Sequence, residues 1–167
     1  MDPQVLGSLA KWPDVPAVYG WLALDRRGNW LLRETADGRF GRVGNAALRE
    51  FISRNYAPDE RGGWYFQNGP QRVYVRLAYA PLVLHYEGNS LFDHCARPAA
   101  ALETYLDDEG SVLMLTSRGL GLLDDRDLAR YADAAAPGAR LRRGEAEARF
   151  GFVSEPRFPC AGPASSL

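Results

Sequence analysis

The fold is decided by residues 64–75, whose sequence is Trp64-Tyr65-Phe66-Gln67-Asn68-Gly69-Pro70-Gln71-Arg72-Val73-Tyr74-Val75. The central Asn-Gly pair is a strong hairpin signal, because both residue types tolerate the positive φ of a tight turn. After the turn, apolar and polar residues alternate up to Tyr79, as they do in a strand with one buried face. This stretch predicts a β-hairpin in an antiparallel sheet.

Two further hairpins are expected, one on each side of this segment. Their turns are Asp25-Arg26-Arg27-Gly28 and Asp107-Asp108-Glu109-Gly110. In both, the aspartate side chain can accept from the turn backbone, and the glycine takes a positive φ at the end. The sequence also predicts extended segments at 18–24, 29–33, 40–43, 63–67, 82–86, 101–106, 111–116, 119–123 and 149–153.

Two helices are expected as well. The first follows Asn45, a good N-cap, carries an apolar stripe at helical spacing and ends at Ala57-Pro58. The second runs from about Asp124 or Asp125 to Ala135, and its acidic first turn suits the helix dipole. Residues 1–16 are expected to be an irregular lead-in with one or two helical turns, and residues 87–98 a loop.

These elements predict an α+β fold with a mainly antiparallel sheet of about seven or more strands and two main helices. The order hairpin, helix, strand occurs over residues 17–86 and again over residues 101–158. One interpretation is an internal pseudo-repeat of β-β-α-β units, with both helices on one face of a single sheet. The other is that ordinary hairpins and capped helices look alike. The matched pairs are Leu24-Asp25 with Leu106-Asp107, Asn45 with Asp125, and Trp64-x-Phe66 with Phe150-x-Phe152.

Length and composition indicate one globular domain over residues 1–167, since 46% of the residues are hydrophobic and 25% charged. The tail 159–167 is expected to be disordered. Only Lys11 among the 20 basic residues is a lysine, which suggests a GC-rich bacterial genome. The two cysteines make no disulfide framework, and neither a secretory signal nor a membrane span is recognisable. A cytoplasmic location is therefore expected.

The charge distribution bears on partners. A net charge of −1 argues against a protein that coats nucleic acid. The charge is uneven: residues 1–80 carry a net +3, residues 81–139 a net −6 and residues 140–167 a net +2. This asymmetry can steer a partner, or can reflect two ordinary solvated faces. The partner stays unknown, no membrane association is expected, and homo-oligomerisation through an edge strand is left open.

The candidates for chemistry are Asp93, His94, Cys95 and His85. A Cys–His pair can produce a thiolate nucleophile, with an aspartate to orient the imidazole. Neighbours in sequence rarely point at each other, so a small buried cysteine in a loop is the ordinary alternative. Two histidines and two cysteines without metal-ligand spacing do not make a zinc site. No metal, cofactor or assigned catalytic residue is expected.

The candidates for binding lie on the central hairpin. Aromatic rings beside amides and an arginine can hold a peptide, a sugar or a base. The alternative is a packed hairpin whose amides satisfy the turn backbone. The hairpin candidates are Trp64, Phe66, Gln67, Asn68, Gln71, Arg72 and Tyr74.

On the same hairpin, the pattern Trp-x-Phe-Gln-Asn-Gly-Pro-Gln-Arg-Val-Tyr-Val resembles a family of small proteobacterial proteins known only as a domain of unknown function. The resemblance also includes the helix before it and the Val18–Trp30 hairpin, and becomes looser from residue 90 on. It implies no activity, cofactor or catalytic residue.

Three functional hypotheses follow from these residues. The leading one is a non-enzymatic binding protein that uses the Trp64–Tyr74 hairpin and an open face of the sheet. The second is a small enzyme that uses His94 and Cys95, or His85. The third is a self-associating structural module. A pocket that gathers His94, Cys95 and a carboxylate within hydrogen-bond reach of one another would favour the enzyme, and their dispersal would contradict it.

Overall fold

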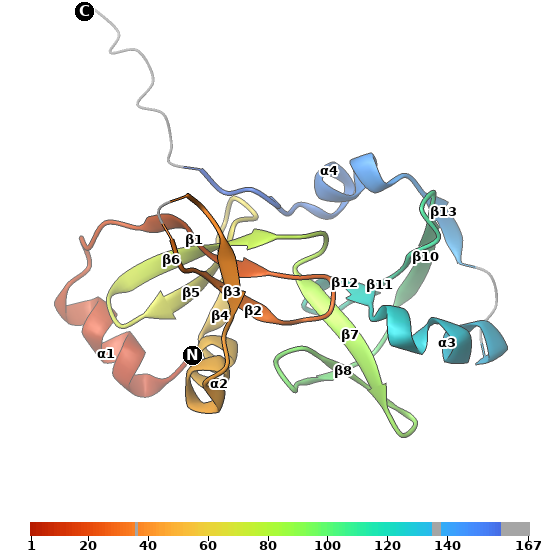
Figure 1. The fold of residues 1–167 in the computed structure, drawn as a ribbon, viewed down its shortest axis with the longest axis horizontal. Coiled ribbons are helices and arrows are strands. Elements are labelled where there is room, and N and C mark those ends of the chain that lie inside the picture. The colour runs from red at the N-terminus through yellow and green to blue at the C-terminus, as the bar shows by residue number, and fades with distance from the viewer. Residues whose placement is uncertain (36, 135–137, 158–167) are drawn as a thin grey trace, which may run out of the picture.

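The computed structural model describes residues 1–35, 37–134 and 138–157. These residues form two β-sheets with helices around them (Figure 1). The helices are α1 (Pro3–Lys11), α2 (Ala46–Arg54), η1 (Asp125–Asp127), α3 (Leu128–Ala134), η2 (Arg143–Glu145) and α4 (Ala146–Phe150). The strands are β1 (Val18–Leu24), β2 (Trp30–Arg33), β3 (Phe40–Arg42), β4 (Tyr56–Pro58), β5 (Trp64–Asn68), β6 (Gln71–Leu77), β7 (Leu82–Glu87), β8 (Ser90–Asp93), β9 (Pro98–Ala99), β10 (Glu103–Asp107), β11 (Val112–Thr116), β12 (Gly119–Leu123) and β13 (Ala139–Leu141).

The first sheet has the strand order β3-β2-β1-β6-β5-β4. Its neighbouring strands are antiparallel except β1 and β6, which are parallel. Helix α2 covers one face: the Phe51 and Phe66 rings meet edge to face at 5.4 Å, and the Trp30 indole donates to Ser53 Oγ at 3.0 Å. In Figure 1, α2 lies below this sheet and the chain after α4 passes above it.

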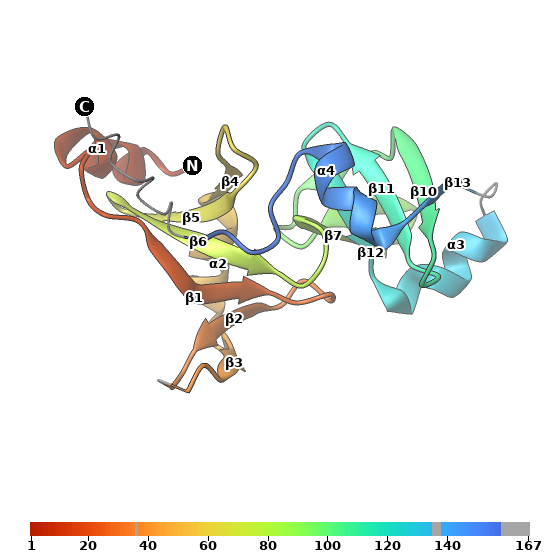
Figure 2. The ribbon, with the colours of Figure 1, turned by 90° about the horizontal axis from the view of Figure 1, so that it is seen from above.

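The second sheet has the order β13-β10-β11-β12-β7-β8-β9, with parallel pairs β10–β13 and β12–β7. Helices α3 and α4 lie beside it (Figure 2). The edge strands of both sheets, β3, β4, β13 and β9, are only two or three residues long. Such short edges offer little backbone for pairing with another chain.

The same five-residue turn occurs four times in the described part of the chain. In each, the first aspartate accepts through Oδ1 from the N–H groups two and four residues later, at 2.6–3.0 Å. The fourth residue has a positive φ, which glycine adopts without strain. The turns are 25–29, 59–63, 93–97 and 107–111.

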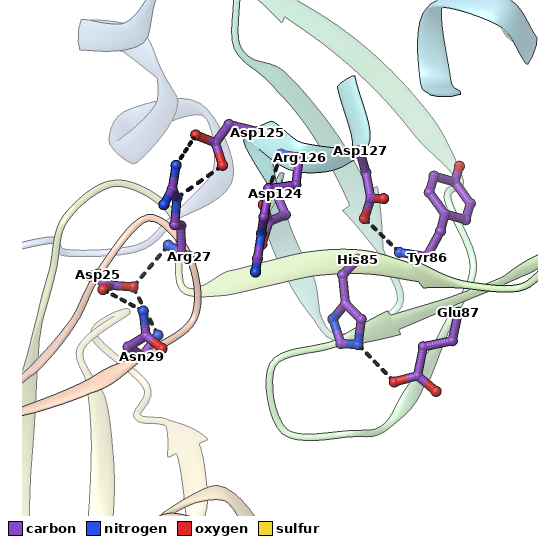
Figure 3. A network of polar contacts seen from close by, with 10 residues as sticks. All are labelled: Asp25, Arg27, Asn29, His85, Tyr86, Glu87, Asp124, Asp125, Arg126 and Asp127. Carbon is purple, nitrogen blue, oxygen red and sulfur yellow. Dashed lines mark hydrogen bonds and ion pairs between the residues drawn. The ribbon is translucent and has the colours of Figure 1, made fainter. Parts of the chain in front are cut away.

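Three of these turns meet between the two sheets. A Cβ on Gly28 would come within 2.7 Å of His94 Cβ, so glycine is needed for this close approach. Arg26 donates to Ser111 Oγ at 2.8 Å. Arg27 binds Asp125 at 2.8 Å, as Figure 3 shows. The buried side chains of both sheets belong to one continuous cluster, so the sheets share their core.

The predicted α+β class is confirmed, with mostly antiparallel strands in two sheets. The expected single sheet is wrong, because Ala80-Pro81 separates β6 from β7 and the two strands join different sheets. The internal repeat is not confirmed. Its third match fails, because Phe150 ends helix α4 whereas Trp64 begins strand β5.

Several local predictions also need correction. The supposed loop 87–98 contains β8 and a turn at Asp93. The supposed strand 149–153 is instead the end of α4, which Gly151 terminates at φ 66°. The lead-in contains the nine-residue helix α1, which docks through buried Val5. The expected end of the second helix at Ala135 and the expected disordered tail (159–167) lie outside the described residues.

Candidate functional site

The central hairpin presents two different faces. Trp64 and Phe66 point into the core beneath α2 and are 5% and 6% exposed. Gln67 is fully buried, and its amide donates to the Gly69 carbonyl at 2.9 Å. Gln71 donates to the Pro16 carbonyl at 3.2 Å, and Asn68 is exposed at the tip. Trp64 and Phe66 are therefore core residues. Gln67 and Gln71 bind backbone carbonyls, and Asn68 lies at the tip of the hairpin.

The other hairpin face belongs to a larger surface, which we call the outer face. Residues paired across strands share a face, and the pairing places these side chains opposite α2. Phe40 pairs with Arg33, Arg42 with Leu31, and Arg76 with Ala23. The outer face consists of Trp21, Ala23, Leu31, Arg33, Phe40, Arg42, Tyr65, Gln67, Arg72, Tyr74 and Arg76, with Tyr19 stacked at its side.

Arginines stack on aromatic rings across this face. The Arg72 guanidinium lies 4.5 Å from the Tyr65 ring centroid, and Arg33 lies 5.9 Å from that of Trp21. Arg76 reaches the Phe40 ring at 5.9 Å, across β1 and β2. Such contacts contribute about 0.5–1 kcal/mol each where the pair is exposed. They hold rigid, amphipathic groups in place. Trp21 of this face is 53% exposed, whereas Ala23, Tyr65 and Gln67 are buried.

A cleft of about 740 Å³ adjoins the outer face at the hairpin, lined by Tyr65, Arg72, Tyr74 and the turn that begins at Asp59. The Tyr74 hydroxyl donates to Asp59 Oδ2 at 2.6 Å, and its ring stacks on Tyr19 at 4.6 Å. Burial and this hydrogen bond raise the pKa of Tyr74 to about 12. Burial by itself raises the pKa of Asp59. The hydrogen bonds from Tyr74 and from the turn N–H groups outweigh this effect, so the pKa of Asp59 is lowered. Both groups therefore keep their usual charge at neutral pH.

His94 lies between the two sheets rather than free in a loop. Its ring contacts Trp30 and Tyr56 at centroid distances of 5.1 and 5.5 Å. Nδ1 accepts from the Val83 N–H at 3.2 Å, which leaves the proton on Nε2. Among the described residues no partner for Nε2 is found. Burial lowers the pKa of His94 to about 3, so the imidazole is neutral at physiological pH.

Cys95 lines the same cleft as His94, a space of about 720 Å³ beside α2 that also includes Glu50. A carboxylate, an imidazole and a thiol are thus brought to one cleft. Burial, however, raises the pKa of the Cys95 thiol to about 11, although Arg97 and Ser53 act in the opposite direction. The thiol therefore stays protonated at neutral pH and is a poor nucleophile.

Asp93 is not available to orient the imidazole. It is fully buried, accepts two turn N–H groups through Oδ1, and forms an ion pair with Arg118 through Oδ2. His85 lies apart on β7, where its Nε2 is 3.2 Å from Glu87 Oε1 (Figure 3). The structure thus gives Asp93 a structural role and separates His85 from the other candidates.

The outer-face residues on β1, β2 and β3 are not among the candidates predicted from the sequence. Trp21 alternates with the core residue Leu22 on β1, and this period of two is the signal that could have found it. No signal in one strand could show that Phe40 meets Arg76, because two strands separate them. Across the described ranges, we find no helix suited to crossing a membrane. The same residues hold no group of three or more His, Cys, Asp or Glu placed to bind a metal ion.

Comparison with known proteins gives a family and a fold. No curated protein matches the chain. A DUF1285 family protein from Silicibacter pomeroyi DSS-3 is similar in structure, with a TM-score of 0.51, 17% identity, and 75% of this chain and 74% of that chain covered. A DUF1285 family protein from Shewanella baltica OS155 has a TM-score of 0.50 and 14% identity, over 69% and 92% of the chains. At these identities the likeness concerns the fold alone.

The family model described as "Protein of unknown function (DUF2946)" matches residues 1–157. The resemblance to a family of unknown function is thus confirmed in its general form. That the segment 64–75 marks this family stays a prediction. None of the comparisons indicates a specific activity. The match spans nearly the whole sequence, and the chain therefore belongs to this family of proteins of unknown function.

Proposed function

We propose that the protein is a non-enzymatic binding protein whose binding surface is the outer face of the six-stranded sheet. One observation supports this proposal: arginines and aromatic rings from five strands share the sheet face opposite α2. Trp, Tyr and Arg are the residues that contribute most to binding energy at protein interfaces. The cleft of about 740 Å³ at Arg72 and Tyr74 is a concave anchor point at one end of this surface.

The chemistry of the remaining candidates favours binding over catalysis. A cysteine nucleophile requires a lowered pKa or an adjacent base. Here burial raises the pKa of Cys95 to about 11 and lowers that of His94 to about 3. Asp93 is held by its own turn and by Arg118. The short edge strands likewise favour recognition of a different molecule over self-association through an edge.

We infer also that the described chain acts as one domain, in the bacterial cytoplasm. The core cluster that extends through both sheets supports one domain, because neither sheet buries its apolar face alone. The near absence of lysine and the low cysteine count support the location.

Two exposed tryptophans make a matched pair for the test. Trp21 is on the outer face and 53% exposed, whereas Trp12 follows α1 and is 51% exposed. We would immobilise the wild-type protein, Trp21→Ala and Trp12→Ala and capture partners from the organism that encodes the chain. We expect at least one partner that wild type and Trp12→Ala retain and Trp21→Ala loses. The same partners on all three proteins, or none that depends on Trp21, would contradict the proposal.

A further inference from the structure

We propose that the outer face recognises an acidic segment of a partner protein, an inference that rests on the function proposed above. The charges of the strand residues on the outer face support this proposal. Four of these positions are arginines, namely Arg33, Arg42, Arg72 and Arg76, and none is a carboxylate. Opposite charges across an interface steer association and select the partner.

The chain's own Glu155 shows how this face receives a carboxylate. The segment after α4 is held at the end of the sheet, where the Leu77 N–H donates to the Ser154 carbonyl at 2.8 Å. This places Glu155 Oε1 at 3.5 Å from Arg76 Nε, with more than half of each side chain exposed. Such an exposed ion pair contributes about 0–1 kcal/mol, so a partner carboxylate can displace it.

The extent of the face indicates a polypeptide rather than a small molecule. Five strands spaced about 4.8 Å apart span roughly 19 Å, which exceeds the reach of a small metabolite. The arginines lie on β2, β3 and β6, so a partner must extend across the strands to meet them all. Exposed Trp21 and half-buried Tyr74 supply apolar contacts between these charges.

The choice of an acidic protein over a nucleic acid follows from the whole molecule. Binding to nucleic acid depends on neutralising many phosphates with a basic surface. The chain as a whole is slightly acidic, with a net charge of −1, and residues 81–139 carry ten acidic and four basic groups. These repel a long polyanion that extends past the outer face. A short acidic protein segment fits within it.

The direct test measures binding of three fluorescently labelled probes by anisotropy at low ionic strength: poly-L-glutamate, an oligo(dT) of matched charge and poly-L-lysine. The variants are Arg72→Ala with Arg76→Ala, Glu155→Gln, and the control Arg140→Ala. Arg140 is exposed on β13 in the other sheet, so its removal takes away one positive charge, half the change in the double variant, without touching the outer face. Thermal unfolding of each variant confirms that it is folded.

We expect poly-L-glutamate to bind most tightly and the double arginine variant to weaken it roughly tenfold, since each lost charged contact removes a favourable interaction. We expect Glu155→Gln to strengthen binding up to about threefold, because it leaves Arg76 unpaired, and Arg140→Ala to have no effect. Equal or tighter binding of oligo(dT), or equal weakening by Arg140→Ala, would overturn the acidic-protein assignment. If poly-L-glutamate fails to bind while the Trp21-dependent capture stands, the partner class is wrong and the binding face remains.

Discussion

The histidine between the two sheets makes the stability of this protein depend on pH. Burial lowers the pKa of His94 from 6.5 to about 3 in the folded chain. The unfolded chain therefore takes up the proton first as pH falls, and protonation favours unfolding. The stability associated with neutral His94 is complete above about pH 6.5 and is lost progressively as pH falls toward 3.

The size of the effect follows from the shift. Each pKa unit corresponds to about 1.4 kcal/mol, and at pH 5 the proton is fully available to the unfolded chain but not to the folded one. Between pH 7.5 and pH 5, His94 should reduce the free energy of unfolding by about 2 kcal/mol. The enclosing rings of Trp30 and Tyr56, and the use of Nδ1 by Val83, are the physical reason that the imidazolium is disfavoured.

Urea denaturation at pH 7.5 and at pH 5 measures this loss. In His94→Asn the amide oxygen can still accept from the Val83 N–H, but the titrating group is gone. Between the two pH values, the free energy of unfolding of this variant should therefore change by about 2 kcal/mol less than that of wild type. His85→Asn is the control, because His85 is half-exposed beside Glu87. If His94→Asn shows the same pH dependence as wild type, or if His85→Asn alone removes it, the buried neutral imidazole is the wrong explanation.

Three further substitutions and modifications test the packing. Gly28→Ala should lose more stability than Gly88→Ala in urea denaturation: both have a positive φ, which costs an alanine about 1 kcal/mol, but only at Gly28 would the new Cβ lie within 2.7 Å of another side chain. Tyr79→Phe removes a hydroxyl that donates at 2.7 Å to a buried carboxylate, and should lower the free energy of unfolding by about 1–3 kcal/mol. In a Cys160→Ser background, Cys95 of the folded protein should react with a thiol reagent at pH 8 far more slowly than Cys95 of the urea-unfolded chain, because burial raises the thiol pKa to about 11. Equal rates would contradict the burial of Cys95.

The turns show how far local sequence predicts this fold. Asp25 and Asp107 were recognised because a glycine stands three residues later, at the position of positive φ. The turn at Asp93 has the same hydrogen bonds, but Ala96 occupies that position at φ 57°. Without the glycine, residues 93–97 carry no turn signal, and the sequence therefore predicts a loop where strand β8 lies. The missed hairpin is thus a case where tertiary packing overrides a local preference.

The arrangement into two sheets lies beyond the reach of such signals. Pro81 marks a break after β6, which the sequence shows, but a break is also compatible with one continuing sheet. What separates the sheets is the parallel pairing of β1 with β6 and of β7 with β12, between segments about 40 to 55 residues apart. The pattern of a strand does not identify such a partner: the apolar run at the start of β7 indicates burial on both faces but not that β12 is its neighbour.

The candidate site was predictable only in part, because alternation along a strand separates its two faces without placing its neighbours. Alternation along β5 and β6 predicts that Trp64 and Phe66 share one face, and that Tyr65, Arg72 and Tyr74 share the other. On β5 alone it does not say which face is buried, because both faces of that strand contain aromatic residues. Helix α2 decides this when Phe51 packs on Phe66. The candidates divide accordingly: Arg72 and Tyr74 belong to the proposed binding face, whereas the two most conspicuous aromatic residues of the hairpin stabilise the core that holds this face in place.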